Sequence, residues 1–145
     1  MKMALSMIVL DAYQLYEDEP YMNERQKAWF RERLMEQRDL LVQEARIRLR
    51  EIREADMVRV SDMVDRSICE TWREQELRVQ ARFREVLDRN TEALRLIEEG
   101  DYGYCCLTGE PIGIPRMLAL PDALFSVEAQ EFRESNAGYM ALLCG

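Results

Sequence analysis

The chain has 145 residues, 48% hydrophobic and 33% charged, and its 20 Lys and Arg against 28 Asp and Glu give a net charge of −8. This length fits one ordinary domain, or a small module attached to an extended element. The acidic balance argues against binding nucleic acid through its phosphates, which requires a basic face. The sequence contains no histidine, so the commonest general base and the commonest metal ligand are both missing.

The four cysteines are irregularly spaced and do not resemble a disulfide framework, which favours a reducing, cytoplasmic location. They are Cys69, Cys105, Cys106 and Cys144. The N-terminal apolar run is too short for a signal peptide and has no small-residue cleavage site, so we interpret residues 1–22 as an arm that packs on the protein. No run approaches the ~18 apolar residues of a membrane span, and we expect no membrane partner.

A long helix is predicted from the capping pattern at Asn23 and Gln26 to about residue 55, because this stretch lacks glycine and proline. Asn23 can accept from free backbone amides at the helix start, and a Gln three positions later completes a capping box. Apolar residues at spacings of three to four predict one buried stripe. They are Phe30, Leu34, Leu41, Ala45, Leu49 and Ile52.

A second long helix is predicted from about Ser67 to Glu99, followed by Gly100 as a left-handed C′ residue. Its apolar residues follow a heptad pattern, interrupted by the polar residues Glu76 and Asn90. The apolar positions are Ile68, Trp72, Val79, Phe83, Val86, Ala93 and Ile97.

Two such helices, joined by residues 55–65, predict a long antiparallel coiled-coil hairpin of roughly 48 Å. The fold expected is mainly α, in four parts. These are an N-terminal arm (1–22), the hairpin (23–99, with its tip at about 56–67), a small globular module (100–134) and a C-terminal tail (135–145).

The predicted tip carries an acidic pair, Asp62 and Asp65, three positions apart and therefore on one face of a helical turn. In one interpretation these carboxylates solvate the turn and cap the second helix. In the other, the long hairpin delivers them to a narrow site on a partner.

The stretch "YGYCCLTGEPIGIPRMLALPDALFSVEAQ" (102–130) has the pattern of a small zinc finger that lacks most of its ligands. Its apolar side chains could replace a metal, since burying each contributes about 1.5–3 kcal/mol before entropy is subtracted. They are Leu107, Ile112, Ile114, Met117, Leu118, Leu120, Leu124, Phe125, Val127 and Phe132.

The segments "YMNERQKAWFRERL", "SDMVDRS" and "EEGDYGYCCLTGEPIGIPRMLALPDA" resemble DksA/TraR proteins, in the family's order, over residues 20–134. The resemblance implies a hairpin that enters the secondary channel of bacterial RNA polymerase and alters open-complex stability and promoter output in the stringent response, usually with ppGpp. It implies a non-enzymatic, monomeric transcription factor that makes no sequence-specific DNA contact. The alternative is a coiled-coil adaptor that no longer acts on polymerase.

The family's zinc ligands would fall on Cys105, Thr108, Ser126 and Ala129. Only one of these positions offers a thiolate, and zinc requires Cys, His or carboxylate ligands. We therefore predict a degenerate, zinc-free finger with no cofactor. Two alternatives stay open: a metal site completed by Cys106 and Glu128, and a redox role for Cys105 with Cys106.

At the tip, Asp62 and Asp65 match the family's D-x-x-D-x-A motif, with Ser67 in place of the alanine. The resemblance assigns Arg78 and Arg82 to the rim of the polymerase channel, although an ordinary solvated helix face remains the alternative for this pair.

The family's three basic ppGpp contacts would fall on Arg89, Leu120 and Gln130, of which only Arg89 is basic. A polyphosphate requires several cations, so the sequence predicts weakened ppGpp binding.

Overall fold

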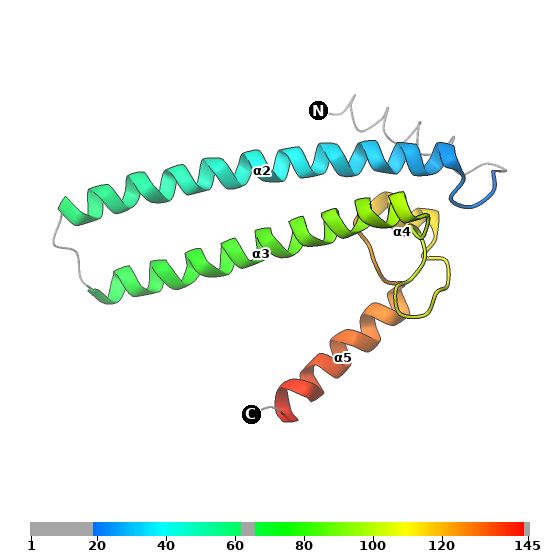
Figure 1. The fold of residues 1–145 in the computed structure, drawn as a ribbon. Coiled ribbons are helices and arrows are strands. Elements are labelled where there is room, and N and C mark those ends of the chain that lie inside the picture. Colours follow the sequence, from blue (N-terminus) through cyan, green and yellow to red (C-terminus); the bar gives the residue numbers. More distant parts are fainter. Residues whose placement is uncertain (1–18, 62–65, 144–145) are drawn as a thin grey trace.

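The computed structural model describes residues 19–61 and 66–143, which form four helices. The two long helices are α2 (Glu24–Ser61) and α3 (Arg66–Glu99), and the two shorter ones are α4 (Ile114–Ala119) and α5 (Val127–Leu143). α2 and α3 run side by side as an antiparallel hairpin, and the chain after α3 forms a small module at one end of it (Figure 1). The mainly helical fold with a long hairpin is therefore confirmed.

The hairpin is longer than predicted because α2 continues past residue 55 to Ser61. Residues 55–61 contain no glycine or proline, so nothing in this segment interrupts the helix. At 1.5 Å per residue, the 38 residues of α2 span about 57 Å. This length carries the free end of the hairpin well beyond the module (Figure 1).

The predicted cap by Asn23 at the start of α2 is confirmed, and Gln26 reaches back one residue beyond Asn23, to Met22. The backbone N–H of Gln26 donates to Oδ1 of Asn23 at 2.8 Å, and Oε1 of Gln26 accepts from the backbone N–H of Met22 at 2.8 Å. α3 ends as predicted at Gly100, whose φ of 90° favours glycine and whose N–H donates to the carbonyl of Leu96.

The hairpin is fully packed only at its base. Phe30 and Leu34 of α2 and Ala93 of α3 are completely buried, whereas the predicted seam positions Leu49 and Trp72 are 46% and 54% exposed. The seam prediction is wrong at these two positions, because a two-helix hairpin distant from the module has no third element to cover its sides. Arg48 lies over the ring of Phe83 at 5.0 Å and covers part of this distal seam.

Asn90 is the polar residue that fixes the pairing of the two helices. It is completely buried on α3, and its Nδ2 donates to the carbonyl of Leu34 at 3.0 Å and to Oε1 of Gln37 at 3.3 Å. A shifted pairing would leave this buried amide without these acceptors, which is costly. The predicted interruption of the seam is therefore a register-setting contact.

The module packs onto the base of the hairpin through one apolar cluster. Tyr102 and Met117 of the module are buried against Phe30 and Leu34 of α2, with the rings of Tyr102 and Phe30 5.6 Å apart. The hydroxyl of Tyr102 donates to the carbonyl of Pro121 at 2.8 Å. The hairpin and the module therefore share a single core.

Tyr21 connects the segment before α2 to two loops of the module. Its hydroxyl donates to the carbonyl of Gly103 at 2.6 Å and accepts from the N–H of Gly113 at 3.0 Å. Burial raises the pKa of Tyr21 above its ordinary value, although the hydrogen bond from Gly113 opposes this shift. The phenol therefore stays protonated, as its bond to Gly103 requires.

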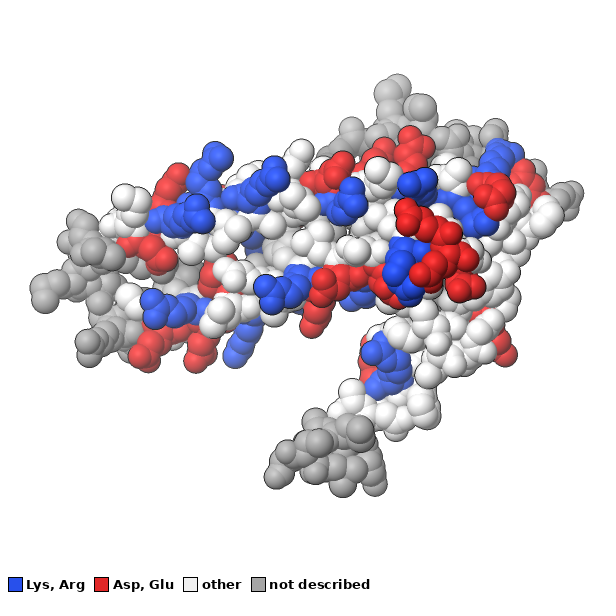
Figure 2. All heavy atoms as spheres, viewed as in Figure 1, with Lys and Arg blue, Asp and Glu red and all other residues white. Residues whose placement is uncertain are grey.

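Charged side chains of both signs lie along the two long helices (Figure 2). Several form ion pairs within one helix, such as Arg48 with Glu44 and Arg95 with Glu92. No described helix is long and apolar enough to cross a membrane.

We predict that Tyr21→Phe lowers the free energy of unfolding by about 1–3 kcal/mol, because the carbonyl of Gly103 and the N–H of Gly113 both lose their partner. Urea denaturation measures this change. Tyr104→Phe is the matched control, since the Tyr104 ring stacks edge-on with Tyr21 at 5.6 Å while its hydroxyl has no hydrogen bond among the described residues. Equal stability losses in the two variants would contradict the bridging role of Tyr21.

Candidate functional site

The predicted acidic tip lies at the free end of the hairpin. Asp62 and Asp65 lie outside the described residues, in the connection between the end of α2 at Ser61 and the start of α3 at Arg66. Ser67 lies in the first turn of α3, although its side chain is not described. The two helix ends that bracket the acidic pair lie at the end of the hairpin opposite the module (Figure 1).

Arg78 and Arg82 lie one turn apart on α3, between the tip and the module. Both are exposed, and neither forms an ion pair with another residue in the described ranges. Two cations one turn apart, with no carboxylate partner among the described residues, can pair with acidic groups of another protein.

Arg89 is not available in the same way, because it is paired with a buried carboxylate. Its Nε donates to Oδ2 of Asp122 at 3.1 Å, and the Asp122 side chain is 1% exposed while that of Arg89 is 45% exposed. Oδ1 of Asp122 has no hydrogen-bond partner in the described part of the chain. Arg89 therefore neutralises a buried charge, and its removal would leave that charge uncompensated.

The two other positions related to ppGpp carry no positive charge. Leu120 is 40% exposed directly after α4, and Nε2 of Gln130 donates to Oε1 of Glu134 at 2.6 Å. These residues and the Arg89–Asp122 pair do not form a cation cluster.

Cys105 lies in a tight turn that directs hydrogen-bond donors at its sulfur. Burial raises the pKa of the Cys105 thiol, but hydrogen bonds from the Thr108 side chain and from the backbone N–H groups of Ser126, Thr108 and Leu107 outweigh it and lower the pKa to about 6. The turn is closed by the N–H of Gly109, which donates to the carbonyl of Cys105 at 2.8 Å. Donors on the neighbouring backbone therefore favour the thiolate form of Cys105.

The four positions assigned to zinc ligands do lie together. Thr108 and Ser126 are close enough to Cys105 to lower its pKa, and Oγ of Ser126 accepts from the N–H of Ala129 at 3.3 Å. The side chains do not fit a zinc ion, because Ala129 has no donor atom and the two hydroxyls are poor zinc ligands. Oγ of Thr108 also accepts from the N–H of Glu110. In the described ranges no three Cys, Asp or Glu side chains are grouped so as to hold a metal.

The alternative ligands Cys106 and Glu128 are both exposed, whereas Cys105 is buried. The hydroxyls of Thr108 and Ser126 accept from separate backbone amides, Thr108 from Glu110 and Ser126 from Ala129. Ser126 thereby caps the start of α5.

The apolar list from the sequence is correct only in part. Ile114 and Met117 are buried, and Ile112, Leu118, Leu124 and Phe125 are partly buried. Four of the expected core residues are exposed, namely Leu107, Leu120, Val127 and Phe132. Tyr102, Ala123 and Ala129 are buried in their place.

The sequence reasoning missed Asp122 and Arg116. Arg116 donates through Nε to the carbonyl of Phe125 at 3.1 Å, and Arg133 lies over the Phe125 ring at 4.1 Å. For Asp122 the sequence did hold one signal. It is the single acidic residue in the apolar run 117–125, where a carboxylate is expected to be paired.

Comparisons with known proteins agree with this architecture. Residues 100–135 match the family described as "Prokaryotic dksA/traR C4-type zinc finger". The chain is 39% identical over 134 residues to the RNA polymerase-binding transcription factor DksA of Caulobacter vibrioides (strain NA1000 / CB15N), covering 92% of this chain and 94% of that protein. It is 30% identical over 141 residues to the protein of the same name from Escherichia coli K12, covering 95% and 93%.

Among solved structures, transcription factor DksA2 from Pseudomonas aeruginosa superposes with a TM-score of 0.71 and 38% identity, covering 88% of this chain and 98% of that one. These relatives are named as transcription factors, which confirms the prediction that the chain is not an enzyme. The identity and coverage show that the chain belongs to the DksA/TraR family.

Proposed function

We propose that this protein is a transcription factor that binds bacterial RNA polymerase through its secondary channel and alters open-complex stability and promoter output, with no zinc ion. The observation that carries the proposal is the identity to relatives named for polymerase binding, over almost their whole length. The shape of the hairpin supports the proposal, because two paired helices about 57 Å long can enter a channel that is too narrow for a globular domain.

The mechanism proposed for the tip is electrostatic. Asp62 and Asp65 would present negative charge near the mobile elements of the polymerase active site and change which of their conformations is populated. Arg78 and Arg82 would hold the hairpin at the rim of the channel. Both are exposed and form no ion pair among the described residues. The long helices would set the distance between these two contacts.

Zinc independence is supported by the contacts that hold the module together. The turn after Cys105 is closed by the N–H of Gly109, which donates to the Cys105 carbonyl, and the hydroxyls of Tyr102 and Tyr21 connect the loops. The ring of Phe30 belongs to the core beneath them. A structural zinc supplies on the order of 10–16 kcal/mol in small modules. Here a core shared with the hairpin would replace that contribution.

We further propose that ppGpp binds weakly or not at all at the position that the family uses. Arg89 already pairs with Asp122, and the two neighbouring family positions are the neutral Leu120 and Gln130. A buried carboxylate beside the only retained cation would also repel a polyphosphate.

The tip is tested with Asp65→Asn. Because asparagine caps a helix as well as aspartate does, this change removes the charge and preserves any cap. We expect polymerase binding to persist. The effect on open-complex lifetime at a ribosomal RNA promoter should fall at least about fivefold, which corresponds to a change of roughly 1 kcal/mol in the conformational equilibrium of the polymerase. Run-off transcription with purified polymerase measures this.

The control for the tip is Glu74→Gln, which neutralises an exposed carboxylate elsewhere on α3. If Asp65→Asn binds and acts like the unmodified protein, the chain is an adaptor and the proposed mechanism is wrong.

The ligand positions are tested by restoring thiols with Thr108→Cys/Ser126→Cys/Ala129→Cys. We expect this variant to bind one zinc ion per chain and the unmodified protein to bind none, as measured by competition with a colorimetric chelator. Adding Cys105→Ala to the triple variant should weaken binding. Stoichiometric zinc in the unmodified protein would contradict zinc independence, and no zinc in the triple variant would contradict the positional assignment.

The ppGpp proposal is tested with Leu120→Arg/Gln130→Lys. Two added cations should raise the affinity of the polymerase complex for ppGpp at least about tenfold, through charge-assisted hydrogen bonds. Leu107→Arg/Gln43→Lys adds the same charge at exposed positions elsewhere and should leave this affinity unchanged. If the unmodified protein already binds ppGpp as tightly as the double variant, the proposal fails.

A further inference from the structure

Three arginines form a stripe along α2, in the half of the hairpin nearest its free end. Arg46, Arg50 and Arg53 follow one another at spacings of four and three, so they share one face of the helix. Arg50 comes 16 positions after the buried Leu34, which places it about 160° around the helix from the seam with α3. All three arginines are exposed. We call them the outer arginine stripe.

The outer arginine stripe carries positive charge that the protein itself does not neutralise. None of its three members pairs with a carboxylate in the part of the chain that the structure describes. Arg48, on another face of the same turns, does pair with Glu44 at 3.3 Å, whereas Glu54, one turn after Arg50, forms no ion pair with it. Like charges at these spacings repel one another in the free protein. An anionic partner would relieve this repulsion.

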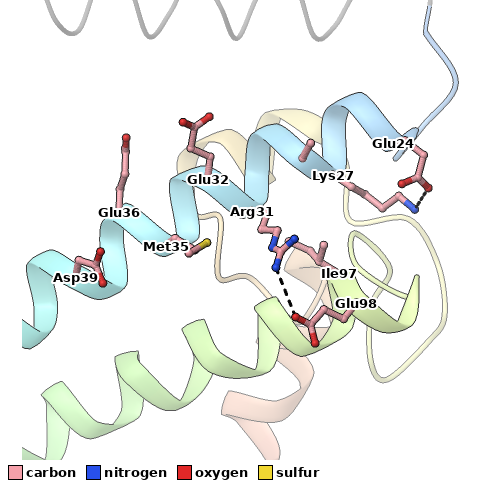
Figure 3. A pocket seen from close by; sticks show the side chains of 10 residues that line it. Glu24, Lys27, Arg31, Glu32, Met35, Glu36, Asp39, Ile97 and Glu98 are labelled. Atoms are coloured by element: carbon pink, nitrogen blue, oxygen red, sulfur yellow. Dashed lines mark hydrogen bonds and ion pairs between the residues drawn. The ribbon is translucent and has the colours of Figure 1, made fainter.

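The same face of α2 is negative near the module, and most of its charges there have partners. The face continues back through Asp39, Glu36 and Glu32, and Figure 3 shows Glu32 and Glu36 pointing away from α3. Glu36 accepts from Arg33 at 3.2 Å, and Oδ1 of Asp39 lies 4.0 Å from Nε of Arg38. The charges of this face are therefore compensated at the base of the hairpin and left uncompensated toward its free end.

We propose that the outer arginine stripe binds an acidic protein surface of RNA polymerase, on the side of the hairpin that faces away from α3. This inference rests on the proposed function, in which the free end of the hairpin enters the secondary channel. At 1.5 Å per residue, the stripe begins about 33 Å from the start of α2, covers about 10 Å and ends about 12 Å before Ser61. With Arg78 and Arg82 on α3, both helices would then contact polymerase through arginines.

Carboxylates of a folded protein fit this stripe better than the phosphates of a nucleic acid. Phosphate recognition uses a broad basic face, whereas the cations here occupy two turns of one helix and have the exposed Glu51 and Glu54 beside them. A few carboxylates on one element of polymerase can form charge-assisted, bidentate pairs with the guanidinium groups. The stripe therefore matches a small acidic patch.

The test is the affinity of the full chain for purified polymerase, measured by biolayer interferometry at about 50 mM and about 300 mM KCl. Arg46→Gln/Arg50→Gln is compared with Arg73→Gln/Arg84→Gln, which removes two exposed arginines of α3 that also form no ion pair among the described residues. The net charge changes equally in both variants, and glutamine is a good helix former.

We expect Arg46→Gln/Arg50→Gln to weaken binding at least about tenfold at the lower salt concentration and to reduce its salt dependence. The control variant should change the affinity less than about twofold. Arg46→Lys/Arg50→Lys keeps the charge and should bind within about threefold of the unmodified chain. A loss of binding in this lysine variant equal to that in the glutamine variant would overturn the electrostatic contact.

Other outcomes also overturn the proposal. Equal weakening by the glutamine variant and its control would show a response to net charge alone. If Arg78→Gln/Arg82→Gln weakens binding and Arg46→Gln/Arg50→Gln does not, the rim contact stands and only this inference fails. If the unmodified chain does not bind polymerase, the proposed function fails and this inference with it. Binding of the chain alone to a labelled single-stranded RNA of about 20 nucleotides, lost in Arg46→Gln/Arg50→Gln, would identify a nucleic acid as the partner instead.

Discussion

The burial of Phe30 and Leu34 beneath the module is the contact on which the rest of the structure depends. These two α2 side chains, Ala93 of α3, and Tyr102 and Met117 of the module form one core with almost no exposed surface. Each large side chain buried there contributes about 1.5–3 kcal/mol. Since the hairpin is fully packed only at this base, the same core also fixes the direction in which it projects.

This arrangement explains how a degenerate finger can keep its shape. Contacts within the protein hold all four positions that the resemblance assigns to zinc ligands. The carbonyl of Cys105 accepts from Gly109, and the hydroxyl of Thr108 accepts from Glu110. Ser126 caps α5, and Ala129 is buried in the module. N–H groups directed at a sulfur stabilise a thiolate whether or not a metal is bound. The turn geometry can therefore persist after the ligands have changed.

Features determined by local chemistry could be predicted from the sequence. The capping box at Asn23 and Gln26, the end of α3 at Gly100 and the fully buried stripe residues Phe30, Leu34 and Ala93 all follow from short-range rules. The polar interruption at Asn90 was also visible, although its partner, the carbonyl of Leu34, lies 56 positions away.

Features that depend on distant partners could not be predicted. Periodicity placed Leu49 and Trp72 in the seam, but both side chains are about half exposed there. The Arg89–Asp122 pair joins residues 33 positions apart, so the sequence can indicate that Asp122 is paired but not that Arg89 is its partner. This pair changes the interpretation of Arg89 from a free ligand contact to the counter-ion of a buried carboxylate.

The central claim is that a packed core, and not a metal ion, holds the hairpin to its module. The most direct measurement is calorimetric unfolding of the purified full chain before and after exhaustive treatment with a strong chelator, with metal analysis of both samples. The account predicts one cooperative transition at the same temperature in both samples. A transition that broadens or moves to lower temperature when stoichiometric zinc is removed would contradict it.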